Sequence, residues 1–289
     1  MEKPEYLDWL NQYTDAEACT SSQQSLPYYL RVNSLKTTAE EYLNWTNLKL
    51  EKTFLSYAFQ VKELPPNGLG NTIDYATGWM HTQSLSSMLP PHLLNPKPGE
   101  NVLDICAAPG SKTTQCAALM QNKGIILAND KNKGRISALA NNIERLGVIN
   151  TSTMNQDGAR FTSPHKFQKI LVDAPCSGLG SSEKAYGWWE EKYSRNISAL
   201  QTAILRTAFS HLEPGGTLVY STCTYPPDEN ERPVSRLLEK NPNAKLEAVE
   251  IPNSEPGIQE FGKEFKKARR VYPHKFNSEG FFLAKIRKP

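Results

Sequence analysis

From Gly99 onward, short apolar stretches alternate with longer amphipathic ones, and this alternation constrains the fold more than any other feature of the sequence. Buried-type strands are expected at residues 101–105, 124–129, 151–154, 170–172, 217–220 and 280–286, and helices at 111–120, 132–146, 197–212 and 229–238. Strands that alternate with helices form a largely parallel sheet covered on both faces. The sequence therefore predicts an α/β fold with a Rossmann-like sheet flanked by helices.

The first third of the chain has a different pattern of predicted helices and strands. Residues 1–25 are polar with one short helical pattern, and residues 28–61 read as a strand (28–32), a helix (38–45) and two further strands. Pro65-Pro66-Asn67-Gly68 breaks the pattern, and one linking helix is expected within residues 79–94. We therefore expect a small α+β domain with a linker helix over residues 1–90 and a larger domain over residues 91–289.

Composition limits the classes of function. The net charge of +3 permits a polyanionic partner without requiring one. No apolar run is long enough to cross a bilayer and no secretory signal core follows Met1, so we expect a cytoplasmic protein without a membrane partner. The five cysteines form no CxxC pair, which indicates neither a disulfide framework nor a zinc site, and we expect no metal.

The loop after the first strand of the larger domain has the character of a cofactor site. It runs from Asp104 to Lys112 and is rich in small residues, which let a ligand approach the backbone. Ligands bind at the carboxyl ends of strands in open α/β sheets, and a helix that begins near Ser111 offers free N–H donors. The loop lacks both the GxGxxG and the Walker spacing, which disfavours dinucleotides and ATP.

Acidic residues follow successive strands of the larger domain, at Asp104, Asp130, Asp157 and Asp173. An acid at the position of Asp130 is placed to accept hydrogen bonds from ribose hydroxyls. Aspartate is also common in loops and helix caps, which is the alternative for any single one. Four on one rim of the sheet favour a binding role.

Two cysteines also lie just past predicted strands. Cys176 stands in Asp-Ala-Pro-Cys-Ser-Gly and Cys223 in Ser-Thr-Cys-Thr, both among loop-forming residues. A single free cysteine is usually an inert buried side chain. Two of them on neighbouring strand ends beside a cofactor-type loop favour a chemical role.

These motifs together resemble the RNA cytosine-5 methyltransferase family of the Sun/NOL1/NOP2 type. The resemblance covers nearly the whole chain, and its compact form is similar to archaeal-type tRNA enzymes. It rests on segments 30–33, 81–91, 106–112, 142–147, 173–178, 221–224, 229–231 and 280–285. It implies a class I methyltransferase sheet, S-adenosylmethionine as cofactor and an RNA-binding type of N-terminal domain.

The resemblance also implies roles that chemistry can justify. Carbon 5 of cytosine is a poor nucleophile until a thiolate adds to carbon 6, and the family's attacking cysteine corresponds to Cys223. Cys176 corresponds to the cysteine that assists breakdown of the covalent adduct and product release. Asp173 would hydrogen-bond the base near N3. Lys112 would position the base and lower a thiol pKa.

The family's cofactor contacts correspond to the loop and to three of the strand-end acids. They are Cys106, Ala107, Ala108, Pro109, Gly110, Ser111, Lys112, Asp130, Asp157 and Asp173. Arg135, one helical turn after Asp130, is a further candidate, with an ordinary surface arginine as the alternative.

The sequence predicts the residues that contact RNA less specifically than those of the cofactor loop. Many relatives carry an Arg-Lys pair after the Pro-Cys-Ser-Gly motif, whereas this chain has Ser181-Ser-Glu-Lys184. Residues 263–275 hold six Lys or Arg interleaved with Phe265 and Tyr272, which suits either phosphate contact with base stacking or an ordinary solvated face. Tyr186, Trp188 and Trp189 favour core packing over a base pocket.

Three functions remain in competition. The first is an RNA cytosine-5 methyltransferase, a monomer that acts on tRNA ahead of rRNA. The second is a DNA cytosine-5 methyltransferase, but that class usually has Gln after its Pro-Cys, where this chain has Ser177, and Cys223 would have no role. The third is an RNA-binding assembly factor without essential turnover, which the intact Cys176, Cys223 and Lys112 disfavour.

Overall fold

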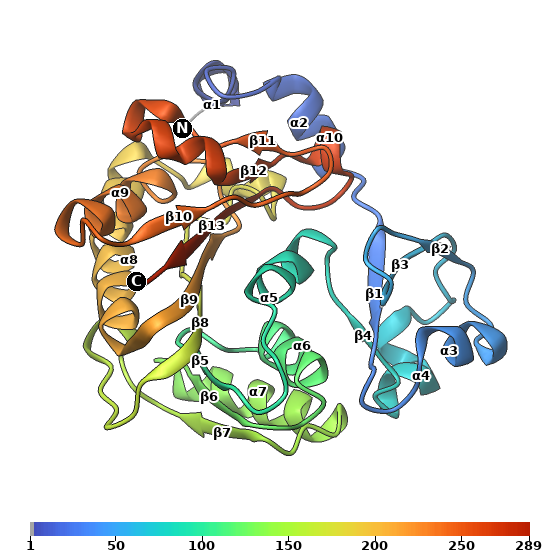
Figure 1. The fold of residues 1–289 in the computed structure, drawn as a ribbon. Coiled ribbons are helices and arrows are strands. Elements are labelled where there is room, and N and C mark those ends of the chain that lie inside the picture. Colours follow the sequence, from blue (N-terminus) through green and yellow to red (C-terminus); the bar gives the residue numbers. More distant parts are fainter. Residues whose placement is uncertain (1–2) are drawn as a thin grey trace.

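The molecule contains two sheets of different size and type (Figure 1). The structure is a computed structural model that describes residues 3–289, apart from the side chain of Glu183. Within that part, no helix is long and apolar enough to cross a bilayer, and no group of three or more His, Cys, Asp or Glu side chains is arranged to hold a metal ion.

The large sheet has the order β11-β12-β13-β9-β8-β5-β6-β7, with β10 paired to β13. Strands β5 to β9 pair in parallel, and β13 runs antiparallel to β9. The strands are β5 (Asn101–Asp104), β6 (Ile125–Asn129), β7 (Thr151–Met154), β8 (Phe167–Asp173), β9 (Leu212–Thr222), β10 (Lys245–Glu247), β11 (Glu255–Pro256), β12 (Arg269–Val271) and β13 (Phe281–Arg287). The predicted Rossmann-like parallel sheet is confirmed.

Helices cover both faces of this sheet because successive strand residues point to opposite sides. On one face, Leu103, Ile170 and Leu218 pack against α8 (Glu191–His211) and α9 (Glu231–Lys240). On the other face, Val102, Leu171 and Val219 share a core with helices. Those helices are α5 (Leu89–Leu94), α6 (Ser111–Leu119) and α7 (Lys133–Arg145).

The small sheet is antiparallel, in the order β2-β3-β1-β4. Its elements are β1 (Tyr28–Val32), β2 (Leu50–Lys52), β3 (Ala58–Val61), β4 (Met80–Thr82), α3 (Ala39–Trp45) and α4 (Ile73–Ala76). Helix α3 begins at a capping box, in which the Thr38 hydroxyl accepts from the backbone N–H of Glu41 at 3.1 Å and the Glu41 carboxylate accepts from the N–H of Thr38 at 2.9 Å. The small α+β unit is thus present. Within residues 79–94 the chain forms β4 before the expected helix α5.

The small sheet packs against the helices that follow the cofactor-type loop. Arg31 on β1 is buried and donates to the hydroxyl of Thr114 on α6 at 3.0 Å. The His81 ring on β4 hydrogen-bonds the hydroxyl of Ser111 at 2.8 Å. The small domain is therefore fixed beside the first turn of α6.

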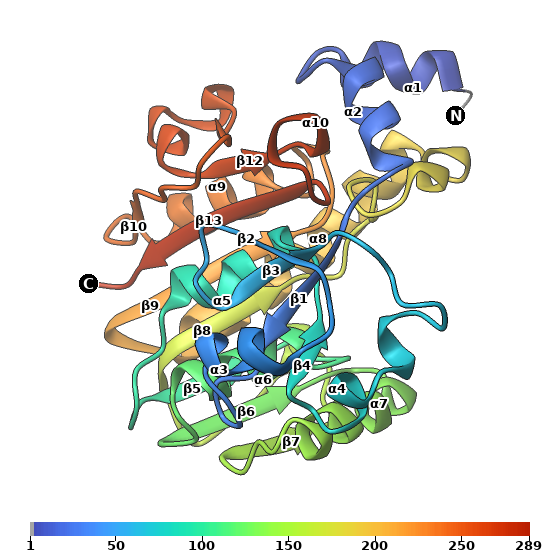
Figure 2. The same ribbon diagram turned by 90° about the vertical axis from the view of Figure 1, so that its right-hand side faces the viewer.

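The first helices belong spatially to the large domain. The helices α1 (Lys3–Leu10) and α2 (Ala16–Gln23) lie beside the C-terminal strands, where α2 contacts α10 (Pro273–Phe276) (Figures 1 and 2). Tyr6, Trp9 and Leu10 share a core cluster with Trp189 and Tyr225. The domain division at residue 90 remains a proposal, and residues 3–23 pack away from the small sheet.

Candidate active site

A cavity of about 630 Å³ opens at the carboxyl ends of β5, β6, β8 and β9. We call it the central cavity. Its lining includes eight residues that the sequence singled out, among them three carboxylates and three thiols. They are Cys106, Ala108, Asp130, Arg135, Asp157, Asp173, Cys176 and Cys223. Residues separated by more than 100 positions in the sequence thus border one space.

Asp130 lies just past the end of β6 and is nearly fully buried. Its carboxylate accepts from the backbone N–H of Ala108 at 3.1 Å and of Asn132 at 2.8 Å. The Arg135 guanidinium is 3.5 Å from it and also donates to the Ala108 carbonyl. Asp130 therefore ties the loop after β5 to the start of α7, and Arg135 belongs to this end of the cavity.

Asp157 borders the same end but is more exposed. Its carboxylate pairs with Lys131 at 2.7 Å and caps the turn at Ala159 through a 3.1 Å hydrogen bond. The hydrogen bond from Lys131 lowers the pKa of Asp157 below its usual value, so this carboxylate is ionised near neutral pH. The Lys131 side chain is largely in solvent, so this ion pair at the rim of the cavity has little effect on stability.

The loop between β5 and α6 turns sharply before the helix. Gly110 has φ +106°, and a Cβ there would approach the Leu139 side chain to 2.7 Å, so only glycine fits the turn. Cys106 and Ala108 line the cavity, and Ala107, Pro109 and Gly110 shape the turn behind them. Burial lowers the pKa of His81 to about 3, so its ring binds Ser111 in the neutral form.

The two thiols meet at the other end of the cavity. Cys176 follows β8, Cys223 follows β9, and their Sγ atoms are 3.3 Å apart. A hydrogen bond from Cys176 lowers the pKa of Cys223, with a further contribution from the nearby Lys112 cation, while burial and Asp173 oppose the shift. The same contact, together with burial, raises the pKa of Cys176. Cys223 is therefore the thiol that ionises first.

Lys112 and Asp173 form an ion pair beside the thiols. The ammonium of Lys112, on the first turn of α6, is 2.8 Å from Asp173 Oδ2, and Ser221 donates to Asp173 Oδ1 at 2.8 Å. Burial alone would lower the pKa of Lys112, but Asp173 raises it above the usual value, so the lysine stays charged. The predicted grouping of Lys112, Asp173, Cys176 and Cys223 is thus present as geometry.

Buried polar side chains that the sequence did not single out fix the two thiol loops. Glu229 accepts from the backbone N–H of Ser177, beside Cys176, at 2.8 Å, and burial raises its pKa. Ser177 also hydrogen-bonds the hydroxyl of Thr224, beside Cys223, at 2.6 Å. Their only signal in the sequence was membership of the segments that carry the resemblance.

Close backbone contact also holds the Cys176 loop. The Gly180 N–H donates to the Cys223 carbonyl at 2.9 Å, and the Gly280 N–H donates to the Gly180 carbonyl at 2.9 Å. A Cβ on Gly180 would come within 2.4 Å of the Gly280 oxygen. These glycines bring the two cysteine loops and the start of β13 together.

Some expectations are corrected by burial. Asp104 accepts from Thr113 at 2.7 Å beneath the loop and does not line the cavity, and burial raises its pKa to about 7. Phe265 and Tyr272 are core residues, so they are not available to stack on bases. Trp189 is buried as expected, whereas Trp188 is exposed.

Arg270, within the basic stretch 263–275, is also buried. It is ion-paired with Glu231 and donates to the carbonyl of Tyr225 at 2.8 Å. A guanidinium that is buried and ion-paired inside the protein cannot neutralise a phosphate. Arg270 therefore cannot contribute to RNA binding by the basic stretch 263–275.

Comparison with known proteins agrees with this geometry. The family described as 16S rRNA methyltransferase RsmB/F matches residues 91–287. A tRNA (cytosine(49)-C(5))-methyltransferase from Pyrococcus abyssi is 40% identical over 274 residues, which cover 90% of this chain and 88% of that protein. The chain belongs to the RNA cytosine-5 methyltransferase family.

Other members of this RNA cytosine-5 methyltransferase family are longer. Ribosomal RNA small subunit methyltransferase F from Erwinia tasmaniensis is 39% identical over 93% of this chain, which spans 59% of that protein. The 25S rRNA (cytosine-C(5))-methyltransferase nop2 from Schizosaccharomyces pombe is 37% identical, and this chain spans 47% of it.

Solved structures in this methyltransferase family share the whole fold. A methyltransferase homolog from Pyrococcus horikoshii has a TM-score of 0.86 and 33% identity, with full coverage of both chains. NSun6 from the same organism, solved with SFG, has a TM-score of 0.87 and 27% identity, and covers 97% of this chain and 96% of its own. The small sheet and the large sheet therefore recur together.

Proposed function

We propose that this protein uses S-adenosylmethionine to form 5-methylcytosine in RNA, through a transient bond between Cys223 and carbon 6 of the base. One observation carries the proposal: the paired thiols and the three carboxylates border a single cavity at the strand ends. Its volume of about 630 Å³ lies in the range of small-molecule and cofactor sites.

The residues at the acidic end suit the cofactor. Asp130 and Asp157 offer carboxylate oxygens that accept from ribose hydroxyls and pair with an ammonium group, and Cys106 and Ala108 offer backbone beside them. The relative NSun6 was solved with SFG, an analogue of S-adenosylmethionine, which supports this assignment. When bound, the cofactor supplies an electrophilic methyl group.

At the other end, the side chains are arranged for attack on a pyrimidine. Cys223, with its lowered pKa, adds as thiolate to carbon 6, which raises electron density at carbon 5. Asp173, held by Lys112 and Ser221, faces the same cavity and would hydrogen-bond the base near N3. The target cytosine must leave its stack to enter this cavity.

Cys176 is placed for the second half of the reaction. Its raised pKa keeps it as a neutral thiol 3.3 Å from Cys223, within reach of the adduct. Breakdown of the adduct removes the proton from carbon 5 and breaks the bond between Cys223 Sγ and carbon 6. We assign Cys176 to protonation of the departing Cys223 thiolate, which releases the methylated product. If the protein were a DNA cytosine-5 methyltransferase, Cys176 would be the nucleophile instead. The lowered pKa of Cys223 disfavours this alternative.

We favour tRNA as the substrate over rRNA. The Pyrococcus abyssi tRNA enzyme matches this chain over nearly its full length, whereas the rRNA enzymes named above extend well beyond the match. The proposal includes a monomeric cytoplasmic enzyme whose small domain contacts the RNA. An rRNA methyltransferase is the second candidate, because that family description matches residues 91–287.

The test measures transfer of labelled methyl from S-adenosylmethionine to unmodified tRNA and to rRNA fragments, followed by bisulfite sequencing of both. We expect 5-methylcytosine in tRNA, at a defined position. Methylation of rRNA alone would replace the substrate assignment. Methylation of neither RNA by protein that binds the cofactor would favour an assembly factor without turnover.

A further inference from the structure

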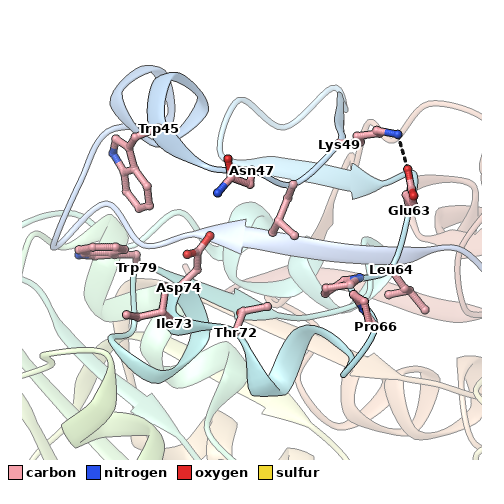
Figure 3. Close-up of a pocket in the computed structure, with 12 residues that line it drawn as sticks. Trp45, Asn47, Lys49, Glu63, Leu64, Pro66, Thr72, Ile73, Asp74 and Trp79 are labelled. Carbon is pink, nitrogen blue, oxygen red and sulfur yellow. Dashed lines mark hydrogen bonds and ion pairs between the residues drawn. The ribbon is translucent and has the colours of Figure 1, made fainter.

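The small domain contains a second cavity that the proposed reaction does not use. It has a volume of about 570 Å³ and is lined by the last residue of α3, the segment that leads into β2, the segment that follows β3, the start of α4 and Trp79 (Figure 3). We call it the small-domain cavity. Its lining consists of Trp45, Asn47, Leu48, Lys49, Glu63, Leu64, Pro65, Pro66, Thr72, Ile73, Asp74 and Trp79.

Three exposed apolar side chains gather at the walls of this cavity. Trp45, Leu64 and Ile73 are 40%, 43% and 71% exposed, and all three border this one space. The rings of Trp45 and Trp79 contact each other at 4.3 Å between centroids with planes 66° apart, so they form two walls of a corner. Exposed apolar side chains that gather around a cavity mark a binding site more often than scattered ones do.

A buried carboxylate beside the indoles gives the cavity a polar specificity element. Asp74 is 9% exposed, and its Oδ2 accepts from the hydroxyls of Tyr42 at 2.8 Å and Thr46 at 3.0 Å. Its Oδ1 has no hydrogen-bond partner among residues 3–289. This oxygen is not one of the fully buried polar atoms that lack a partner, so it is open to the cavity, and its free lone pairs suit a ligand that brings N–H donors.

The charges around the cavity limit what can enter. Lys49 and Glu63 form an ion pair at the mouth and neutralise each other, which leaves Asp74 as the one uncompensated charge of the lining residues. A phosphate would be repelled by this carboxylate. A flat ring with N–H groups on its edge would be accepted, because one of its faces can stack on an indole while its edge reaches Asp74.

We propose that the small-domain cavity binds an unpaired guanine base of the RNA substrate, and this rests on the proposed function. Guanine presents two neighbouring N–H donors, at N1 and N2, toward a carboxylate, and its O6 accepts from an amide such as Asn47. Adenine lacks that donor pair, and pyrimidines present a smaller face to the two indoles. RNA recognition by stacking on aromatic side chains and by Watson–Crick edges is the usual mode for single strands.

The location of the domain supports this ligand. β4 carries His81, which binds Ser111 at the start of α6, and Trp79 of the cavity directly precedes β4. The small-domain cavity therefore belongs to a domain that is fixed against α6, the helix that follows the cofactor-type loop. The proposal requires an RNA that places a flipped cytosine in the central cavity and a second unpaired base in the small-domain cavity.

The experiment compares two pentanucleotides, UUGUU and UUAUU, by following the indole N–H signals of Trp45 and Trp79 in NMR spectra and by titration. We expect the guanine RNA to shift both signals and to bind about tenfold more tightly, the size of a good base-edge contact. Asp74→Asn keeps an oxygen for Tyr42 and Thr46 but places a donor toward the base, so the preference should vanish. Trp45→Ala should weaken binding about tenfold through lost stacking.

The matched control is Tyr28→Ala, which removes an exposed aromatic of the same sheet outside the cavity and should change neither affinity nor preference. Thermal unfolding shows whether each variant keeps its fold. Equal affinity of the wild-type protein for both RNAs would overturn the inference. Shifts of the two indole signals by a lysine-rich peptide instead of the guanine RNA would also overturn it, in favour of a protein-docking site.

A parallel methyl-transfer assay with tRNA separates this inference from the proposed function. Methyl transfer without a guanine preference would contradict the guanine site and would still support the proposed methyl transfer. A guanine preference without any methyl transfer would support guanine binding in the small-domain cavity and would contradict the proposed reaction.

Discussion

The two cavities of this molecule are built by opposite means. The central cavity lies at the ends of parallel strands, and its key side chains are already bound to one another, as in the Lys112–Asp173 pair and the 3.3 Å contact between the thiols. The small-domain cavity is formed by exposed apolar side chains around one carboxylate oxygen that has no partner in the described part of the chain. The first arrangement suits chemistry, which needs fixed groups, and the second suits recognition, which needs open surface.

The largest expected effect tests whether chemistry depends on the central cavity. Cys223→Ala removes the proposed nucleophile and should reduce methyl transfer on the order of 10⁴-fold, because the neighbouring Cys176 has a raised pKa and stays a neutral thiol. Cofactor affinity measured by calorimetry should stay unchanged. Cys116→Ala is the control, since this buried cysteine on α6 lies outside the cavity. Substantial turnover in Cys223→Ala would refute the nucleophile assignment.

The second effect distinguishes the two thiols. Cys176→Ala should let the adduct form but slow its breakdown, so turnover should fall about 10²-fold while a protein–RNA species accumulates on denaturing gels at mildly alkaline pH. The double variant with Cys223→Ala should show no such species. Failure to trap an adduct in the single variant would count against the release role.

The third effect compares the two acids at the cofactor end. Asp130 is buried and accepts from two backbone N–H groups, whereas Asp157 pairs with a solvated lysine. Asp130→Ala should weaken cofactor binding about tenfold or more, because a charge-assisted contact is lost and the loop loosens. Asp157→Ala should cost only a few-fold. Calorimetry checks both, and equal losses would contradict the distinction.

The sequence predicts the central cavity far better than the small-domain cavity, for a physical reason. The parallel strands have continuous apolar runs, and their carboxyl ends must meet at one edge, so the loops of Asp130, Asp173 and Cys223 could be placed together in advance. The small-domain cavity is formed by the ends of α3 and α4 and by segments next to the short strands, all brought together by tertiary packing. Asp74 and Trp79 carry no local pattern that reveals this.

Very short strands and buried charged side chains were the other features that the sequence did not predict. Strand β4 has three residues and β11 two, too few for a periodic signal. The basic stretch 263–275 resembled an RNA-binding face, yet Arg270 pairs with Glu231 inside the protein. Local composition cannot show that a charge will be buried, because its partner lies 39 positions away.

The smallest expected effect concerns the electrostatic setting of Cys223. Its pKa is lowered chiefly by the hydrogen bond from Cys176 and further by Lys112, and the thiolate is the reactive form. The alkylation rate of Cys223 by iodoacetamide should therefore rise with pH through this pKa and then level off, below the pH at which an ordinary thiol does so. Cys176→Ala should move the midpoint to higher pH, and Lys112→Met should move it the same way by a smaller amount. Lys131→Met, at the exposed rim of the same cavity, should leave it in place. Peptide mapping by mass spectrometry assigns the modified cysteine. If neither Cys176→Ala nor Lys112→Met displaced the midpoint, the fixed contacts of the central cavity would not set the pKa of Cys223.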